Sequence, residues 1–158
     1  MVKKLNKALH DWVVHYKDKR QAKERSHRKR IRFDHYEAVY RESVLSSMDP
    51  GVGNDTPHSI TISLTSFGVR IETVYLVVES LMSQSLKADR IVLCLYRGEV
   101  TEANLPATLK RQRERGLEIY FCDEDIGSYK KFFYAFQKYP DDLIITVDDD
   151  VIYPIDTI

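Results

Sequence analysis

The sequence predicts an α/β fold in which helices flank a mostly parallel sheet, and three observations lead to this. From residue 59 onward, short apolar runs alternate with segments in which apolar residues recur at helical spacing. The apolar runs are nearly continuous, as is typical of parallel strands that are covered on both faces. Finally, a cluster of aspartates follows the last run, and ligands in such folds sit beyond the carboxyl ends of the strands.

The first unit of the predicted sheet covers residues 60–96. The run ITISLT (60–65) predicts a strand, and IVLCLY (91–96) predicts a second one. Between them, residues 70–83 have the spacing of a helix with one apolar face. The residues of that face are Ile71, Val74, Tyr75, Val78, Leu81 and Met82.

The second unit begins with a predicted helix over residues 104–116, with Pro106 in its first turn and Gly116 as its stop. The run LEIYFC (117–122) then predicts a third strand. The third unit pairs a helix over residues 128–138 with a fourth strand, LIITV (143–147). The apolar stripe of the last helix consists of Tyr129, Phe132, Phe133 and Phe136.

Charge divides the chain into a basic arm and an acidic body. Residues 1–45 contain 13 Lys and Arg against 6 Asp and Glu, whereas the rest of the chain contains 11 against 18. We therefore expect a basic helical extension over residues 1–45, a linker rich in Ser, Pro and Gly over 46–58, and an α/β domain over 59–158.

The arm has two interpretations. It can be a solvated helical extension that packs on the body, or it can attach to an anionic membrane surface through its lysines, arginines and Trp12. Nucleic-acid binding is not expected, because no aromatic-rich basic sheet or recognition helix accompanies the charge.

The chain is expected to be cytoplasmic, with any membrane contact peripheral and at the inner face. It contains no run of about 18 apolar residues, and its N-terminus lacks the apolar region of a secretory signal. The two cysteines, Cys94 and Cys122, each lie inside an apolar run. They are expected to be reduced core residues rather than parts of a disulfide framework or a zinc site.

The triplet Asp148–Asp149–Asp150 follows the fourth predicted strand. On an extended backbone, Asp148 and Asp150 project to one side and Asp149 to the other. Two carboxylates on one side can share a hard divalent cation, Mg²⁺ or Mn²⁺, which prefers oxygen ligands and keeps positions open for phosphates. The alternative is a solvated acidic turn, but the position at the expected ligand edge favours a metal site.

The segment 125-DIGSYKK-131 is the second candidate. Ser128 is expected to cap the following helix, and Gly127 leaves room for a close approach of the backbone. Lys130 and Lys131 then fall in the first helical turn, where the helix dipole disfavours cations. An anion bound there would explain them, so we expect a diphosphate to bridge the lysines and the metal. Two solvated lysines are the alternative.

The end of the first strand, 64-LTSFGVR-70, is the third candidate. Thr65, Ser66 and Arg70 can line the mouth of a nucleotide pocket. Alternatively, Ser66 and Gly68 only form the turn into the helix, which is the favoured explanation for Gly68.

Residues 59–154 resemble the GT-A glycosyltransferases, in particular the family 2-like enzymes of bacterial surface polysaccharide synthesis. The opening of that family runs strand, turn, helix with an E-S-L-x-x-Q pattern, strand. Here Glu79, Ser80, Leu81 and Gln84 stand in the pattern, residues 125–135 resemble the Gly-led helix, and residues 148–150 resemble the D-x-D motif.

The resemblance implies a Rossmann-like GT-A half that binds a nucleotide-diphospho-sugar with Mn²⁺ or Mg²⁺ between D-x-D and the diphosphate. It implies that Asp150 ligates the metal, that Asp148 contacts the ribose or the metal, and that Thr65 lies near the base. The metal would stabilise the departing nucleoside diphosphate while a hydroxyl of a glycan or lipid-linked acceptor attacks the anomeric carbon.

Two departures from the family pattern affect these expectations. Many members have an Asp at the end of the second strand, where this chain has Tyr96 and Arg97. The family's catalytic base lies beyond the D-x-D strand, so we expect it beyond Ile158 and expect this chain alone not to complete the reaction. Two alternatives remain open: a truncated, non-catalytic protein that binds nucleotide sugars, membranes or partners, and a haloacid-dehalogenase-type phosphatase.

Overall fold

The computed structural model describes residues 17–21, 23–24 and 34–158, and the chain divides into two compact units, residues 1–37 and 38–158. In the first unit, residues 17–21 and 23–24 are helical, and Arg20 forms an ion pair with Glu24 across one helical turn, at 3.2 Å. The predicted helical pattern over residues 2–16, with Trp12, lies outside the described residues. In the described part of the chain, no helix has the length and apolar character needed to span a bilayer.

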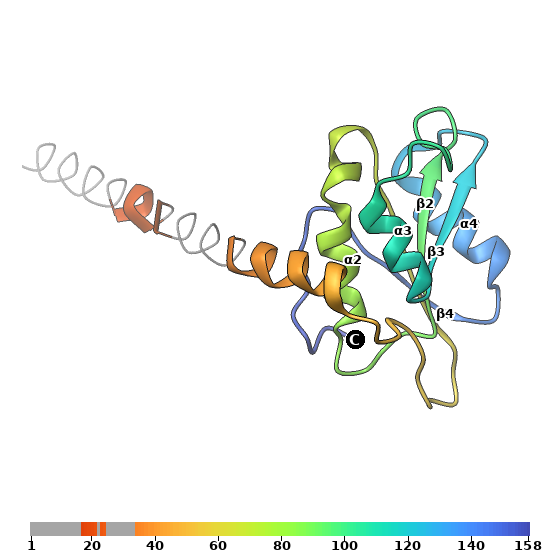
Figure 1. Ribbon diagram of the computed structural model, residues 1–158, viewed down its shortest axis with the longest axis horizontal. Coiled ribbons are helices and arrows are strands. Elements are labelled where there is room, and N and C mark those ends of the chain that lie inside the picture. The colour runs from red at the N-terminus through yellow and green to blue at the C-terminus, as the bar shows by residue number, and fades with distance from the viewer. Residues whose placement is uncertain (1–16, 22, 25–33) are drawn as a thin grey trace, which may run out of the picture. The chain divides into compact units, whose positions relative to one another are not determined.

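The second unit contains a four-stranded sheet in which every pair of neighbouring strands is parallel (Figure 1). The spatial order is β3-β2-β1-β4, so the order reverses between β1 and β4. This confirms the predicted α/β class and the parallel sheet, an arrangement consistent with a Rossmann-like fold. The strands are β1 (Ile60–Thr65), β2 (Arg90–Tyr96), β3 (Leu117–Cys122) and β4 (Leu143–Thr146).

The helices lie between the strands in the predicted order, but their bounds differ from the prediction. They are η1 (Gly68–Glu72), α2 (Val74–Met82), α3 (Ala107–Glu114), η2 (Gly127–Tyr129) and α4 (Lys130–Lys138). Pro106 is not in the first turn of α3: it precedes the helix, because its ψ of 142° is extended. Gly116 follows the end of α3 with φ of 108°, a conformation that favours glycine, as its predicted role as a stop requires.

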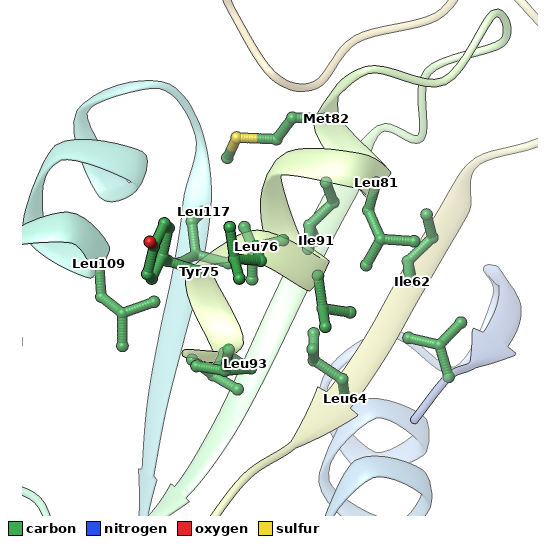
Figure 2. Close-up of a cluster of buried hydrophobic side chains, with 14 of the residues drawn as sticks. Ile62, Leu64, Tyr75, Leu76, Leu81, Met82, Ile91, Leu93, Leu109 and Leu117 are labelled. Carbon is green, nitrogen blue, oxygen red and sulfur yellow. The ribbon is translucent and has the colours of Figure 1, made fainter. Parts of the chain in front are cut away.

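The two faces of the sheet differ in chemistry. Alternate residues of the central strands, such as Ile62 and Leu93, pack with α2 and α3 in the main core (Figure 2). A second, smaller cluster consists of Val92, Cys94 and Cys122, with Tyr134 and Tyr139 of the α4 region packed against it. Both cysteines are buried and free, and their burial confirms the prediction that they lie in the core.

The apolar stripe predicted for α4 is not the buried side of this helix. Its aromatic stripe faces solvent, and the exposed fractions are 71% for Tyr129, 49% for Phe132, 44% for Phe133 and 49% for Phe136. Lys130 and Ala135 are buried instead. The sheet face toward α4 explains this, because it carries polar and small side chains that accommodate the stems and polar ends of lysines and tyrosines.

The segment before β1 is attached to the body through backbone and side-chain contacts. Residues 34–46 are helical, as the predicted spacing of Tyr36, Tyr40 and Val44 requires, and Val44 is fully buried in the main core. Residues 47–58 contain no helix or strand, and Gly51 N–H donates to the Arg115 carbonyl at 2.8 Å.

Candidate functional site

The aspartate triplet lies where β4 ends, beside the carboxyl end of β1. The β1–β4 register pairs Ser63 with Thr146, and Val147 N–H donates to the Ser63 carbonyl at 3.0 Å. Beyond this bond the chain turns. The side chain of Asp149 is 7% exposed, whereas those of Asp148 and Asp150 are 68% and 59% exposed. The burial therefore alternates along the triplet as predicted, although Asp149 and Asp150 lie in a turn and not on an extended backbone.

Asp149 is the residue that fixes the triplet to β1. The Ser66 hydroxyl donates to Asp149 Oδ2 at 2.6 Å, and Arg70 Nη1 donates to Asp149 Oδ1 at 2.9 Å. Arg70 Nη1 also lies 3.5 Å from Asp150 Oδ2. Two predicted site residues, Ser66 and Arg70, thus meet the triplet, but they contact mainly the aspartate to which the sequence assigned no role.

Lys131 brings a second cation to the triplet from α4. Its Nζ donates to Asp148 Oδ1 at 2.7 Å and to the Val147 carbonyl at 3.0 Å. The hydrogen bond and the charge of this ammonium hold the pKa of Asp148 below its ordinary value. Lys131 therefore lies at the triplet, as a diphosphate-bridging lysine would.

Lys130 lies elsewhere. Its side chain is 3% exposed, and its ammonium pairs with Asp125, which also accepts a hydrogen bond from the Gly127 N–H at 3.1 Å. These contacts lower the pKa of Asp125, with the Lys130 bond as the larger cause. Lys130 therefore stabilises the turn over residues 125–130 through its pairing with Asp125. The predicted cap is also absent, because Ser128 lies inside η2 and no side chain caps α4.

The remaining predicted residues have clear local roles. The Thr65 hydroxyl donates to the Cys94 carbonyl at 2.7 Å, so it links β1 to β2 inside the sheet. Gly68 and Gly127 have φ of 57° and 61°, the left-handed region, and a Cβ at Gly127 would meet nothing within 4 Å. Gly68 is therefore a turn residue, as favoured, and the backbone at Gly127 is open to close approach.

The end of β2 is occupied by an ion pair. Arg97 Nε donates to Asp123 Oδ1 at 2.9 Å, and its guanidinium lies 5.7 Å from the centre of the Phe121 ring. A carboxylate is therefore present at this edge of the sheet, but it follows β3 rather than β2. Sequence reasoning did not single out Asp123.

Sequence reasoning also missed Tyr153, whose hydroxyl accepts a hydrogen bond from the Asp148 N–H at 2.9 Å. Tyr153 N–H in turn donates to the Ser80 hydroxyl on α2 at 3.2 Å. The available signal was indirect: Ser80 and Gln84 are polar residues four positions apart, at and just after the end of a largely apolar helix.

The carboxylates suit a hard divalent cation in their chemistry. In the described part of the chain, no three His, Cys, Asp or Glu side chains are grouped to hold a metal ion. Magnesium-type sites, however, commonly use one or two carboxylates together with substrate phosphates. Asp148 and Asp150 are the exposed members of the triplet and fit such a site, whereas Asp149 is engaged with Ser66 and Arg70.

Comparison with known proteins adds no further assignment: no protein-family model, curated protein or solved structure matches this chain.

Proposed function

We propose that residues 59–158 form the donor-binding half of a GT-A, family 2-like glycosyltransferase, which binds a nucleotide-diphospho-sugar with Mn²⁺ or Mg²⁺. The observation that carries the proposal is the meeting of Asp148–Asp150 with Arg70 and Lys131 where the strand order reverses. In open parallel sheets, ligands bind outside the carboxyl ends of the strands at such a reversal. At that place the carboxylates would bind the metal, and the cations would bind the diphosphate.

In this proposal Asp150 holds the metal, and Asp148 contacts the metal or the ribose. When bound, the cation acts as a Lewis acid that stabilises charge on the departing nucleoside diphosphate. Arg70 holds Asp149 and reaches Asp150, so it fixes the direction of the metal-binding carboxylate. Lys131 is placed to exchange part of its contact with Asp148 for a phosphate oxygen.

The acceptor in this proposal is a glycan or lipid-linked hydroxyl of cell-surface polysaccharide synthesis. The basic arm would favour an acceptor at an anionic membrane surface, to which the protein attaches peripherally. The proposal assigns no catalytic base to this chain, so it concerns binding of the donor and not the complete transfer.

One observation favours a metal-independent variant of this function, a non-catalytic protein that binds nucleotide sugars. Each aspartate of the triplet already lies within 4.0 Å of a lysine or arginine nitrogen of the chain. Two cations, Arg70 and Lys131, thus offset most of the charge of the three carboxylates without a metal ion. In this variant the same cations would bind the diphosphate directly.

Isothermal titration calorimetry with uridine, guanosine and cytidine diphospho-sugars tests the proposal. We expect one class to bind in the presence of Mn²⁺ and to lose most of its affinity with EDTA or in Asp150→Ala. Asp141→Ala, which removes an exposed carboxylate before β4, is the matched control and should bind like the wild type.

Three results separate the alternatives. Equal binding with EDTA favours the metal-independent variant. Unchanged metal-dependent binding in Asp150→Ala overturns the assignment of the metal ligand. Absence of binding by any of the three donor classes overturns the proposed function.

A further inference from the structure

The segment after the triplet is fixed to the C-terminal end of α2 by a set of hydrogen bonds. Tyr153 N–H donates to the Ser80 hydroxyl, which itself donates to the Val77 carbonyl at 2.7 Å. Ser85 N–H donates to the Ile155 carbonyl at 2.7 Å. Ser80 is completely buried, so its hydroxyl is not shared with bulk solvent.

Gln84 is the centre of this set, and every hydrogen-bonding position of its amide is used. Its Nε2 donates to the Ser80 carbonyl at 2.9 Å and to the Pro154 carbonyl at 2.7 Å. Its Oε1 accepts from the N–H groups of Thr157 and Ile158 at 2.9 and 3.2 Å. Gln84 is 4% exposed, and a buried amide with all its partners present fixes the backbone that it contacts.

Tyr153 transmits this attachment to the triplet. Its backbone is held on α2, its ring packs against the main core, and its hydroxyl accepts from the Asp148 N–H at 2.9 Å. The turn that carries Asp148 and Asp150 is therefore held on one side by Ser66 and Arg70, through Asp149, and on the other by Tyr153.

We propose that Ser80, Gln84 and Tyr153 are positioning residues that fix the direction of the Asp148 and Asp150 carboxylates for ligand binding. In the described part of the chain, none of the three side chains forms a hydrogen bond with those carboxylates, so they act through the backbone of the turn. The inference rests on the proposed function for the identity of the ligand. It explains why the polar residues Ser80, near the end of α2, and Gln84, just after it, are buried.

The substitution Tyr153→Phe tests this inference, because it removes the hydroxyl acceptor and keeps the ring. Tyr120→Phe, at a partly exposed tyrosine on β3, is the matched control. Binding is measured with Mn²⁺ and uridine, guanosine or cytidine diphosphate, with Mn²⁺ followed by electron paramagnetic resonance. We expect Tyr153→Phe to bind about three- to tenfold more weakly than the control at an equal melting temperature.

Amide hydrogen exchange gives a second readout that needs no ligand. In Tyr153→Phe the Asp148 amide should lose protection while the amides of β1 keep theirs. If Tyr153→Phe binds the diphosphate as tightly as the wild type does, the inference is overturned and the proposed function stands. If the wild type binds none of the diphosphates, the proposed function fails, and unchanged protection of the Asp148 amide would then overturn the positioning role as well.

Discussion

Ser66 and Asp149 are joined by a hydrogen bond of 2.6 Å although 83 residues separate them in the sequence. The bond ties the end of β1 to the turn after β4, and Arg70 adds a second tie at 2.9 Å. Asp149 is thereby part of the protein interior, whereas its two neighbours face solvent. The triplet thus divides into one structural aspartate and two that are available to a ligand.

This division predicts opposite effects of two substitutions. Asp149→Ala should lower the free energy of unfolding by about 1–3 kcal/mol, because the buried Ser66 hydroxyl and Arg70 lose their acceptor. Asp150→Ala should change it by less than about 0.5 kcal/mol, because that side chain is 59% exposed. Urea denaturation of both variants measures the difference. Equal destabilisation would show that the turn does not depend on Asp149.

The contact between Lys131 and Asp148 predicts a pH effect. The ordinary pKa of the Asp148 carboxyl is 3.8, and Lys131 lowers it in the folded state. A lowered pKa means that the contact adds stability above the pKa of the unfolded chain and loses this contribution as the pH falls through the folded value. Because Asp148 is 68% exposed, the effect on global stability is small and the local titration is the better measurement.

We therefore expect Lys131→Met to raise the pKa of Asp148 toward 3.8. NMR of the Asp148 carboxyl carbon, recorded between about pH 2 and 6, measures this pKa. Lys138→Met is the matched control: it removes the lysine that pairs with Glu118 and should leave the Asp148 titration as in the wild type. An Asp148 pKa that stays low without Lys131 would contradict the contact.

A buried ion pair joins α2 to the end of α3 and gives a third prediction. Arg115 Nη1 lies 2.7 Å from Glu79 Oε1, and the two side chains are 8% and 0% exposed. Ser43 and Gln112 also donate to the Glu79 carboxylate, at 2.6 and 2.9 Å. Removing one charge from such a pair leaves the other buried and uncompensated.

Glu79→Gln is accordingly expected to lower the free energy of unfolding by about 3 kcal/mol in urea denaturation. Glu102→Gln breaks the more exposed pair with Arg113 and should cost less than about 1 kcal/mol. Equal losses in the free energy of unfolding for the two variants would show that Glu79 and Arg115 do not form a buried ion pair in the folded protein.

The cysteines give a fourth prediction. The hydrogen bond with Cys94 and burial together raise the pKa of the Cys122 thiol. Cys94 and Cys122 are 0% and 1% exposed, so neither thiol is accessible in the folded chain. Ellman's reagent at pH 8 should react with both thiols only when urea unfolds the protein, at a rate that follows unfolding. Fast reaction of a native thiol would contradict this packing.

The strand and helix order could be predicted because apolar runs and turn residues are local signals. The strand bounds of Ile60–Thr65 and Leu117–Cys122 match the predicted ranges. The contacts of Asp149 could not be predicted in the same way. They depend on which strand lies next to β4, and no local pattern shows that the neighbour is β1 and brings Ser66 to the turn.

The error at α4 has a different origin, because an overlooked signal was present in β1. Its sequence alternates apolar Ile60, Ile62 and Leu64 with hydroxyl-bearing Thr61, Ser63 and Thr65. The prediction treated this strand as a nearly continuous apolar run and did not use the alternation. The alternation instead indicates that the layer on the second face contributes polar groups, as Lys130 and Tyr139 do.

The orientation of α4 gives the last prediction. Ala135 is 1% exposed and Phe136 is 49% exposed, so the smaller side chain is the one in the interior. Ala135→Asp should lower the free energy of unfolding by several kcal/mol, because it buries an unpaired charge. Phe136→Ser should cost less than about 1 kcal/mol. Gln137→Asp places the same new residue on the exposed side of α4 and controls for helix propensity. Urea denaturation that ranks Phe136→Ser as the more damaging change would show that α4 packs through its aromatic stripe.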